Sequence, residues 1–316
     1  MKEKVYNHYV PQFLMRNFSD NGNSIGQYIK NSRSYIKDAS IKKICGANYL
    51  YGKTSELEDI LRDLERLWAK SIKKICIKEK LLLNKEEKKL IYSFITVSDA
   101  RTYDMAMQQE KSFNEIIKND VRYAHLAKIE EFKSIDENRV KIKLNRPNLI
   151  PIKYALDIVD SLYTTTVLAL IINRTSIPFI TSDCPVAKYN YLLLDSFCGY
   201  GWEQKGLLAF VSVSSKCMLA LIDKNTYKIN SLNPNRIILH DDESVTELNK
   251  LMALQANIFL LFNNSLEKDY LDLISKDKLK DINLDFSHLC IAYCHIKSVK
   301  NKINLPFLKL KRKENN

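Results

Sequence analysis

The chain has 316 residues and a formal net charge of +12, with 46% hydrophobic and 27% charged residues. This composition is ordinary for a globular protein and excludes a disordered chain. No apolar run approaches the roughly 18–20 residues that a membrane helix needs, so no membrane partner is expected. The first residues contain no apolar signal-peptide segment, and the seven cysteines are scattered, as is typical of reduced thiols. We therefore expect a cytoplasmic protein.

The positive charge favours RNA, DNA or a nucleotide as a partner, because a positive surface potential attracts polyanions. Only 11 of the 49 basic residues are Arg, however, and the other 38 are Lys. Arg is the residue preferred for bidentate contact with phosphate, so an excess made mostly of Lys is the weaker indication. The composition does not indicate an oligomeric state.

The first part of the chain predicts a short helix, a hairpin and a long helix. Residues 5–19 favour a short helix with Pro11 at its first position. Residues 24–30 and 34–40 flank a polar turn and favour a hairpin. A capping box at Ser55–Glu58 opens an amphipathic helix with apolar residues at helical spacing.

The middle of the chain predicts further helices. A second long helix is expected from Asn84 to about Asn119, and residues 140–144 are a candidate edge strand. Pro151 is then expected to open another amphipathic helix that continues to Tyr163.

Beyond residue 165 short apolar runs replace the long helical patterns, which favours strands. We therefore predict an α+β fold, with a helical N-terminal half packed on a mixed, largely antiparallel sheet from the C-terminal half.

The chain is expected to form a single domain, 1–316, with subdomains 1–165 and 166–305 and a basic tail at 306–316. The default expectation for that tail is disorder, and the alternative is weak binding of polyanions. The expected strands are 167–174, 178–181 (joined to the first by a tight turn), 207–213, 218–223, 257–262 and 289–297, with a helix at 243–255.

Polar residues interrupt the apolar face of the second long helix. Leu90, Phe94 and neighbouring residues define that face, and Ser98, Arg101 and Thr102 continue it. A guanidinium on an apolar face must be paired or must line a wet cleft, because burying it alone is very costly. The two interpretations are an internal ion pair that joins two subdomains and an anion-binding arginine in a pocket.

The N-terminal segment contains a similar group of polar residues. Gln12 and Arg16 lie four residues apart and share one side of the short helix, with His8 before it and Asn17 at its end. These side chains either bind neighbouring backbone or form part of a ligand site.

A third polar segment, Thr181–Pro185, follows a predicted strand. Ser182 and Asp183 are well placed for a site at the end of that strand. They are equally typical of a turn, because Ser and Asp side chains bind local backbone.

These three segments resemble motifs of the family called domain of unknown function 4238. The run from His8 to Phe18 is similar to the opening motif of the family, and residues 179–186 resemble its second motif, with Cys184 where Asn is common. The helix that carries Arg101 and Thr102 resembles its middle element. The resemblance implies a bacterial or phage-associated cytoplasmic protein without an established reaction. Its motif residues in this chain are His8, Gln12, Arg16, Asn17, Arg101, Ser182 and Asp183.

Known catalytic signatures are missing from the sequence. It has no Walker loop, dinucleotide-binding fingerprint or nucleophile elbow, and only seven glycines. The cluster of His288, Cys290, Cys294 and His295 lacks the spacing of a zinc site, and we predict no metal and no cofactor.

The polar residues nevertheless suggest one catalytic arrangement. His8 could act as a general base, Asp183 could orient it or act as an acid, and Arg16 with Arg101 could stabilise negative charge. The corresponding activity is a metal-independent phosphodiesterase acting on nucleic acid or nucleotides, such as an RNase-like toxin or a phage-defence effector. The alternative is a non-catalytic module that binds an anionic ligand or a partner protein, and a third interpretation makes the cluster purely structural. Whether the chain is an enzyme stays open at this point. Residues predicted to bind the ligand are Gln12, Asn17, Ser98, Thr102 and Ser182.

Overall fold

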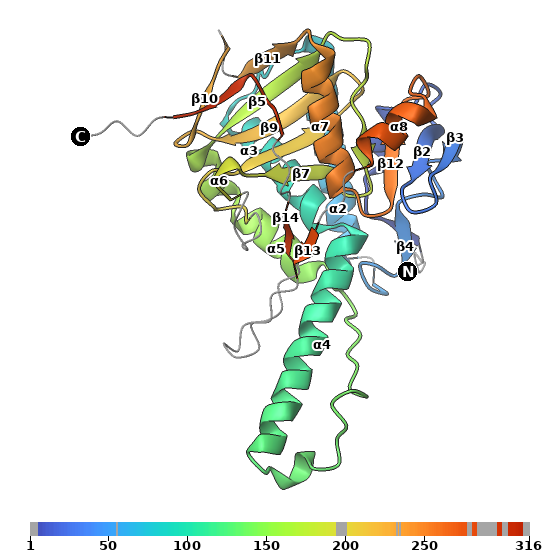
Figure 1. Cartoon of the computed structure of the whole chain (residues 1–316), viewed down its shortest axis with the longest axis vertical. Coiled ribbons are helices and arrows are strands. Elements are labelled where there is room, and N and C mark those ends of the chain that lie inside the picture. Colours follow the sequence, from blue (N-terminus) through green and yellow to red (C-terminus); the bar gives the residue numbers. More distant parts are fainter. Residues whose placement is uncertain are drawn as a thin grey trace, which may run out of the picture.

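A five-stranded mixed sheet forms the centre of the molecule (Figure 1). The computed structural model describes residues 6–54, 56–193, 201–231, 233, 235–276, 280–282, 296–298 and 303–311. In the sheet, β11 runs parallel to β5 and the other neighbours are antiparallel. The helices of the N-terminal half pack on this sheet, which confirms the predicted α+β fold. In spatial order the strands are β11 (Arg236–Leu239), β5 (Thr166–Asn173), β9 (Cys217–Asp223), β8 (Leu208–Ser212) and β7 (Val186–Tyr189).

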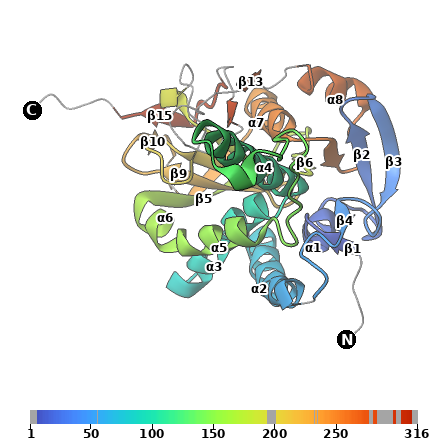
Figure 2. The ribbon, with the colours of Figure 1, turned by 90° about the horizontal axis from the view of Figure 1, so that it is seen from below.

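Helices cover both faces of this sheet (Figure 2). The helices α2 (Glu56–Lys78), α3 (Lys85–Ala100), α5 (Leu149–Asp157) and α6 (Val159–Thr165) lie on one face, and α7 (Asp242–Gln255) lies on the other. Successive side chains of a strand point to opposite faces. In β5, Leu168 and Leu170 accordingly belong to the core under α2 and α3, whereas Ala169 and Ile171 belong to the core under α7. Burial on both faces explains why this strand is an uninterrupted apolar run.

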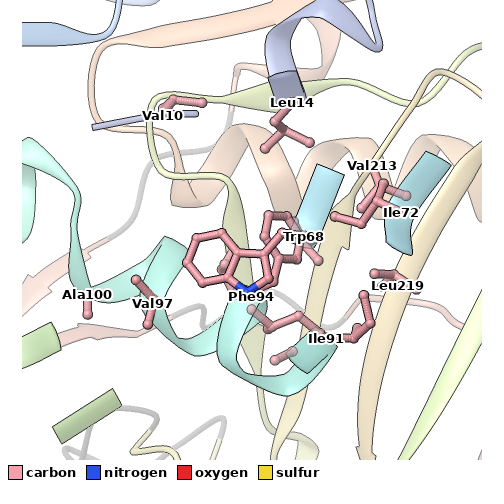
Figure 3. Close-up of a cluster of buried hydrophobic side chains, with 14 of the residues drawn as sticks. Val10, Leu14, Trp68, Ile72, Ile91, Phe94, Val97, Ala100, Val213 and Leu219 are labelled. Carbon is pink, nitrogen blue, oxygen red and sulfur yellow. The ribbon is translucent and has the colours of Figure 1, made fainter. Parts of the chain in front are cut away.

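Trp68 and Phe94 form the centre of the first core (Figure 3). Their rings meet edge to face with centroids 5.7 Å apart, and the indole Nε1 of Trp68 donates a hydrogen bond of 3.0 Å to Ser93. Ile72, one turn after Trp68, lies in the same cluster as Leu219 of β9. These contacts hold α2 against α3 and the sheet, and they thereby position the side chains that α2 carries.

A smaller four-stranded sheet lies beside the first, in the order β3-β2-β12-β6. The predicted hairpin is confirmed as β2 (Ser24–Ile29) and β3 (Ser34–Ser40). The strand predicted at 257–262 is β12 (Phe259–Phe262), and it pairs with β2 and with β6 (Thr181–Ser182). The prediction that 178–181 forms a hairpin with the preceding strand was wrong, because β6 is only two residues long and pairs with β12 instead.

The second predicted long helix is two helices. α3 begins at a capping box formed by Asn84 and Glu87 and ends at Arg101. α4 (Tyr103–Leu126) begins after Thr102, whose hydroxyl accepts a hydrogen bond of 3.2 Å from the backbone N–H of Met105. Thr102 has an extended backbone and N-caps α4, so the chain changes direction there. α4 consequently projects from the body of the molecule (Figure 1).

The return from α4 is irregular rather than a strand. A short 3-10 helix at Glu130–Phe132 follows α4, and residues 133–148 then lead back to α5. The predicted edge strand at 140–144 was wrong because the backbone of Ile142 bonds to the side chain of Asn114 on α4. The helix predicted from Pro151 begins two residues earlier and is divided into α5 and α6 at Ile158.

The remaining elements complete the two ends of the chain. The helix α1 (Gln12–Arg16) follows β1 (Tyr6–His8), which pairs with β4 (Gly46–Asn48). Part of the predicted basic tail is a strand, β15 (Leu308–Leu310), paired with β10 (Tyr227–Ile229). The predicted capping residue Ser55 and residues 288–295, with their His and Cys cluster, lie outside the described residues. Two further strands, β13 (Lys280–Ile282) and β14 (Ile296–Ser298), form a pair, and α8 is Lys268–Ile274.

None of the helices in the described ranges combines the length and the apolar character that crossing a membrane requires.

Candidate functional site

A pocket of about 300 Å³ lies between α1 and α2, which we call the α1–α2 pocket. It brings together four of the sequence-predicted site residues. The buried guanidinium of Arg101 forms its floor, half-buried His8 and Gln12 form its wall, and exposed Arg16 lies at its rim. The pocket is lined by His8, Gln12, Phe13, Arg16, Tyr51, Glu58, Leu61, Arg62, Glu65, Arg66, Ala69 and Arg101.

Arg101 is held at the junction of α3 and α4 by three partners. Its Nη1 pairs with the carboxylate of Glu65 at 2.6 Å, its Nη2 donates to the carbonyl of His8 at 2.7 Å, and its Nε donates to the hydroxyl of Tyr51 at 3.0 Å. Burial alone would lower the pKa of Arg101, but Tyr51 and Glu65 outweigh it and raise the pKa. The prediction that this arginine must be paired is confirmed. The pair joins α2 to the α3–α4 junction, so it lies within the helical half instead of joining two subdomains.

His8, Gln12 and Arg16 form a chain of polar contacts across the wall of the pocket. The amide Nε2 of Gln12 lies 3.2 Å from Nδ1 and 3.3 Å from Nε2 of the His8 ring, and Arg16 donates to the Gln12 carbonyl oxygen at 2.5 Å. The four-residue spacing of Gln12 and Arg16 places both on one side of α1. Among the described residues, no carboxylate forms an ion pair with Arg16.

α2 contributes charges of both signs to the pocket. Glu58 and Glu65 lie seven residues apart and therefore on one face of the helix. Glu58 accepts a hydrogen bond of 2.6 Å from Asn7. Arg62 and Arg66 lie on the solvent side, and each pairs with an aspartate three residues earlier, at 2.8 and 3.1 Å. Arg101 is buried and paired with Glu65, so the exposed arginines Arg16, Arg62 and Arg66 are the ones that can reach an external anion. Arg16 differs from the other two because no carboxylate pairs with it among the described residues.

The structure does not bring Asp183 into the α1–α2 pocket. Its buried carboxylate accepts hydrogen bonds from the backbone N–H groups of Asn257 at 2.9 Å and Ile258 at 2.7 Å, at the start of β12. Burial outweighs these bonds and raises the pKa of Asp183 to about 6. Ser182 binds both the N–H and the carbonyl of Cys184, so it forms the local turn. The turn interpretation of this segment therefore describes Ser182. The Asp183 carboxylate binds backbone from a distant part of the chain instead, and the role of orienting His8 does not fit it.

Asn17, Ser98 and Thr102 also lie away from the lining of the pocket. Asn17 donates to the carbonyl of Val213 at 2.9 Å and ties α1 to the loop after β8. Ser98 is fully buried in α3, and Thr102 caps α4. These three side chains have positions typical of structural residues.

Sequence reasoning missed three lining residues, Tyr51, Glu58 and Glu65. A signal for the two glutamates was present, because they lie on the side of α2 that also carries Leu61. A buried Arg101 requires a carboxylate partner. Glu65 was a candidate for that partner, because it lies one helical turn after buried Leu61 on α2. Tyr51 had no signal, since it lies in the turn between β4 and α2 and its position depends on how that turn leads into α2.

The lining of the pocket includes several hydrogen-bond donors. Three of its side chains, His8, Gln12 and Arg16, can donate hydrogen bonds, which is the chemistry that binds anions such as phosphate. Within the described residues, no group of three or more His, Cys, Asp or Glu side chains is arranged to hold a metal.

Comparison with protein families gives a match to the family described as "Protein of unknown function (DUF4238)", over residues 6–265. Comparison with curated proteins and with solved structures gives no match. The match covers most of the chain and includes all of the α1–α2 pocket. The chain therefore belongs to this family.

Proposed function

We propose that this member of the DUF4238 family binds a phosphate-bearing ligand, a nucleotide or a nucleic acid, in the α1–α2 pocket. The observation that carries the proposal is Arg16, an exposed guanidinium that shares a pocket with His8 and Gln12 and has no carboxylate partner among the described residues. A guanidinium and an amide that face the same space form charge-assisted hydrogen bonds with phosphate oxygens.

Arg101 supports this role indirectly. Because its guanidinium already has three partners, Arg101 is a positioning residue. It donates hydrogen bonds to the backbone carbonyl of His8 and to the hydroxyl of Tyr51, and these bonds fix the wall of the pocket. Its charge is balanced by Glu65, so the electrostatic attraction for a ligand comes mainly from the rim.

A binding experiment with Arg16→Ala tests the proposal. Inorganic phosphate, AMP, a diadenosine dinucleotide and a short RNA are titrated by calorimetry at low and at physiological salt. Arg139→Ala is the matched control, because it removes the same charge from a side chain that is 88% exposed and, among the described residues, forms an ion pair with Asp136 on the return from α4.

We expect at least one probe to bind and Arg16→Ala to weaken its affinity by about 10- to 100-fold, the value of one or two charge-assisted hydrogen bonds. Arg139→Ala should leave the affinity within about twofold. Lack of binding by every probe, or equal losses in the two variants, would refute the proposal.

The second candidate function is a metal-independent phosphodiesterase, and the imidazole of His8 in the same pocket favours it. His8 would transfer the proton, and Arg16 would stabilise the charge of the pentavalent phosphate. An RNase-like toxin or a phage-defence effector would have this activity. Asp183, the predicted orienting acid, binds the backbone of Asn257 and Ile258 and does not line this pocket. Binding through Arg16 is therefore the leading proposal.

Cleavage assays separate the two functions. Wild type and His8→Gln are incubated with RNA, DNA and dinucleotides in the presence and absence of EDTA. A phosphodiesterase of this kind cleaves in EDTA and loses activity in His8→Gln, while the affinity for the probe changes little. Absence of cleavage by wild type, or equal cleavage by His8→Gln, leaves binding as the function.

A further inference from the structure

Two cysteine side chains that are 141 residues apart in the sequence meet at the C-terminal end of α2. Cys76 lies one helical turn after Ile72, and Cys217 lies two residues before Leu219 on the same face of β9. Ile72 and Leu219 pack in one core cluster (Figure 3), and Cys76 and Cys217 belong to the same cluster. The helical and strand periods therefore bring the two thiols together.

The surroundings of the pair are polar on one side. The thiols are hydrogen-bonded to each other and to the hydroxyl of Ser214, which also accepts the backbone N–H of Cys217 at 3.0 Å. Close by, Arg174 forms a two-bond ion pair with Glu79, the residue after α2. Cys76 is partly exposed whereas Cys217 is buried, so an oxidant of small size reaches the pair from the Cys76 side.

The two thiols differ in acidity. The hydrogen bond with Cys76 lowers the pKa of Cys217, and Ser214 and Arg174 act in the same direction. The same bond raises the pKa of Cys76. Two thiols in contact, one of them partly exposed, form the arrangement in which one cysteine reacts first and the second resolves the product.

We propose that Cys76 and Cys217 are a redox modification site that forms a reversible disulfide on reaction with a hydroperoxide. One thiolate of the pair attacks a peroxide oxygen, which breaks the O–O bond and gives a sulfenic acid and hydroxide. The sulfur of the other cysteine then displaces the sulfenic oxygen as water. In total two thiols and one H₂O₂ give one disulfide and two waters, and two electrons pass from sulfur to oxygen.

The bond would join α2 covalently to the central sheet. α2 carries Glu58 and Glu65 of the α1–α2 pocket, so oxidation acts on the element that forms one wall of that pocket. The disulfide would close a loop between residues 76 and 217, and a cross-link over a loop this long lowers the conformational entropy of the unfolded chain strongly. The inference does not depend on what the pocket binds.

Peptide mapping tests the site. Reduced full-length protein is treated with H₂O₂, blocked with N-ethylmaleimide and digested without reductant, and the fragments are identified by mass spectrometry. We expect a peptide pair linked through Cys76 and Cys217 that dithiothreitol separates. The peptides of Cys45 and Cys184, two buried cysteines, serve as internal controls and should remain reduced.

Thermal unfolding supplies the second measurement. The oxidised protein should unfold about 5 °C higher than the reduced protein. Cys76→Ser should abolish this shift and the linked peptide, and Cys217→Ala should do the same. Absence of the linked peptide in wild type, linkage of either cysteine to a different one, or an unchanged melting temperature in the linked protein would overturn the proposal.

Discussion

Replacing Arg101 by Ala should destabilise the protein by about 3–4 kcal/mol. The substitution removes hydrogen bonds to the hydroxyl of Tyr51 and the carbonyl of His8, each worth about 1 kcal/mol, and a charge-assisted bond to Glu65 worth about 2 kcal/mol. The sum of about 4 kcal/mol lies in the middle of the range of about 3–5 kcal/mol for breaking a buried ion pair. A loss in the upper part of that range is not expected, because the Glu65 side chain is 26% exposed and water can solvate its carboxylate once the partner is gone.

Urea unfolding followed by tryptophan fluorescence measures this loss, since Trp68 lies in the core next to the affected helices. Arg66→Ala is the matched control, because its side chain is 72% exposed and its ion pair with Asp63 should contribute less than about 0.5 kcal/mol. Glu65→Gln and the double variant complete a cycle that isolates the pair. A loss below about 1 kcal/mol for Arg101→Ala would refute the assignment of Arg101 as a residue that holds α2 to the α3–α4 junction.

Two further predictions concern stability. The pKa of Asp183 is raised to about 6 in the folded protein from 3.8, so the folded state binds the proton more tightly and its stability falls as the pH rises from about 4 to 7. The change in the free energy of unfolding from this one carboxyl is about 3 kcal/mol, and Asp183→Asn should lack it. Urea unfolding of both proteins across this pH range measures the difference. Profiles that run parallel for the two proteins would contradict the prediction. Gly26→Ala should cost about 1–3 kcal/mol, because a Cβ there would lie 2.3 Å from the buried ring of Phe262. Gly201→Ala is the control without a clash, because a Cβ there would meet only Gln204, at an ordinary van der Waals distance of 3.5 Å.

Elements with a strong local pattern could be predicted from the sequence. The hairpin β2–β3, the helix α7 and the strands β5, β8 and β9 agree closely with their predicted ranges. Their periodicity coincides with their burial, since the apolar runs of β5 and β9 are covered on both faces. In these elements local sequence and tertiary packing favour the same structure.

The break between α3 and α4 shows where local pattern is insufficient. The apolar spacing continues through residues 98–102, so periodicity alone predicts one helix. Thr102 can either continue a helix or cap one, and the choice depends on its environment. Asn148 donates to the carbonyls of Ala100 and Thr102 at 2.9 and 3.0 Å, and it comes from a segment almost 50 residues away. No periodicity in the helix itself contains that information.

The candidate site was predicted in part for a similar reason. His8, Gln12 and Arg16 lie within nine residues of each other, and a short helix was enough to group them. Arg101 was found because a charge on an apolar face requires a partner. Asp183 was grouped with them through its position after a strand, but its carboxylate binds the backbone of β12 from another part of the chain. Which backbone N–H groups a buried carboxylate binds depends on the tertiary structure, so the local sequence around Asp183 does not contain that information.

The order of strands in the smaller sheet has a consequence for biosynthesis. β12 lies between β2 and β6, so strands made early in translation acquire their shared neighbour only after residue 262 has left the ribosome. Until then one edge of the β2–β3 hairpin has unpaired backbone groups, and such an edge can pair with another nascent chain. Pairing over more than 200 residues also makes this sheet a slow step in folding. The β2–β3 hairpin therefore gains its neighbouring strand only after β12 has been synthesised. Chaperones that shield exposed strand edges would act during that interval.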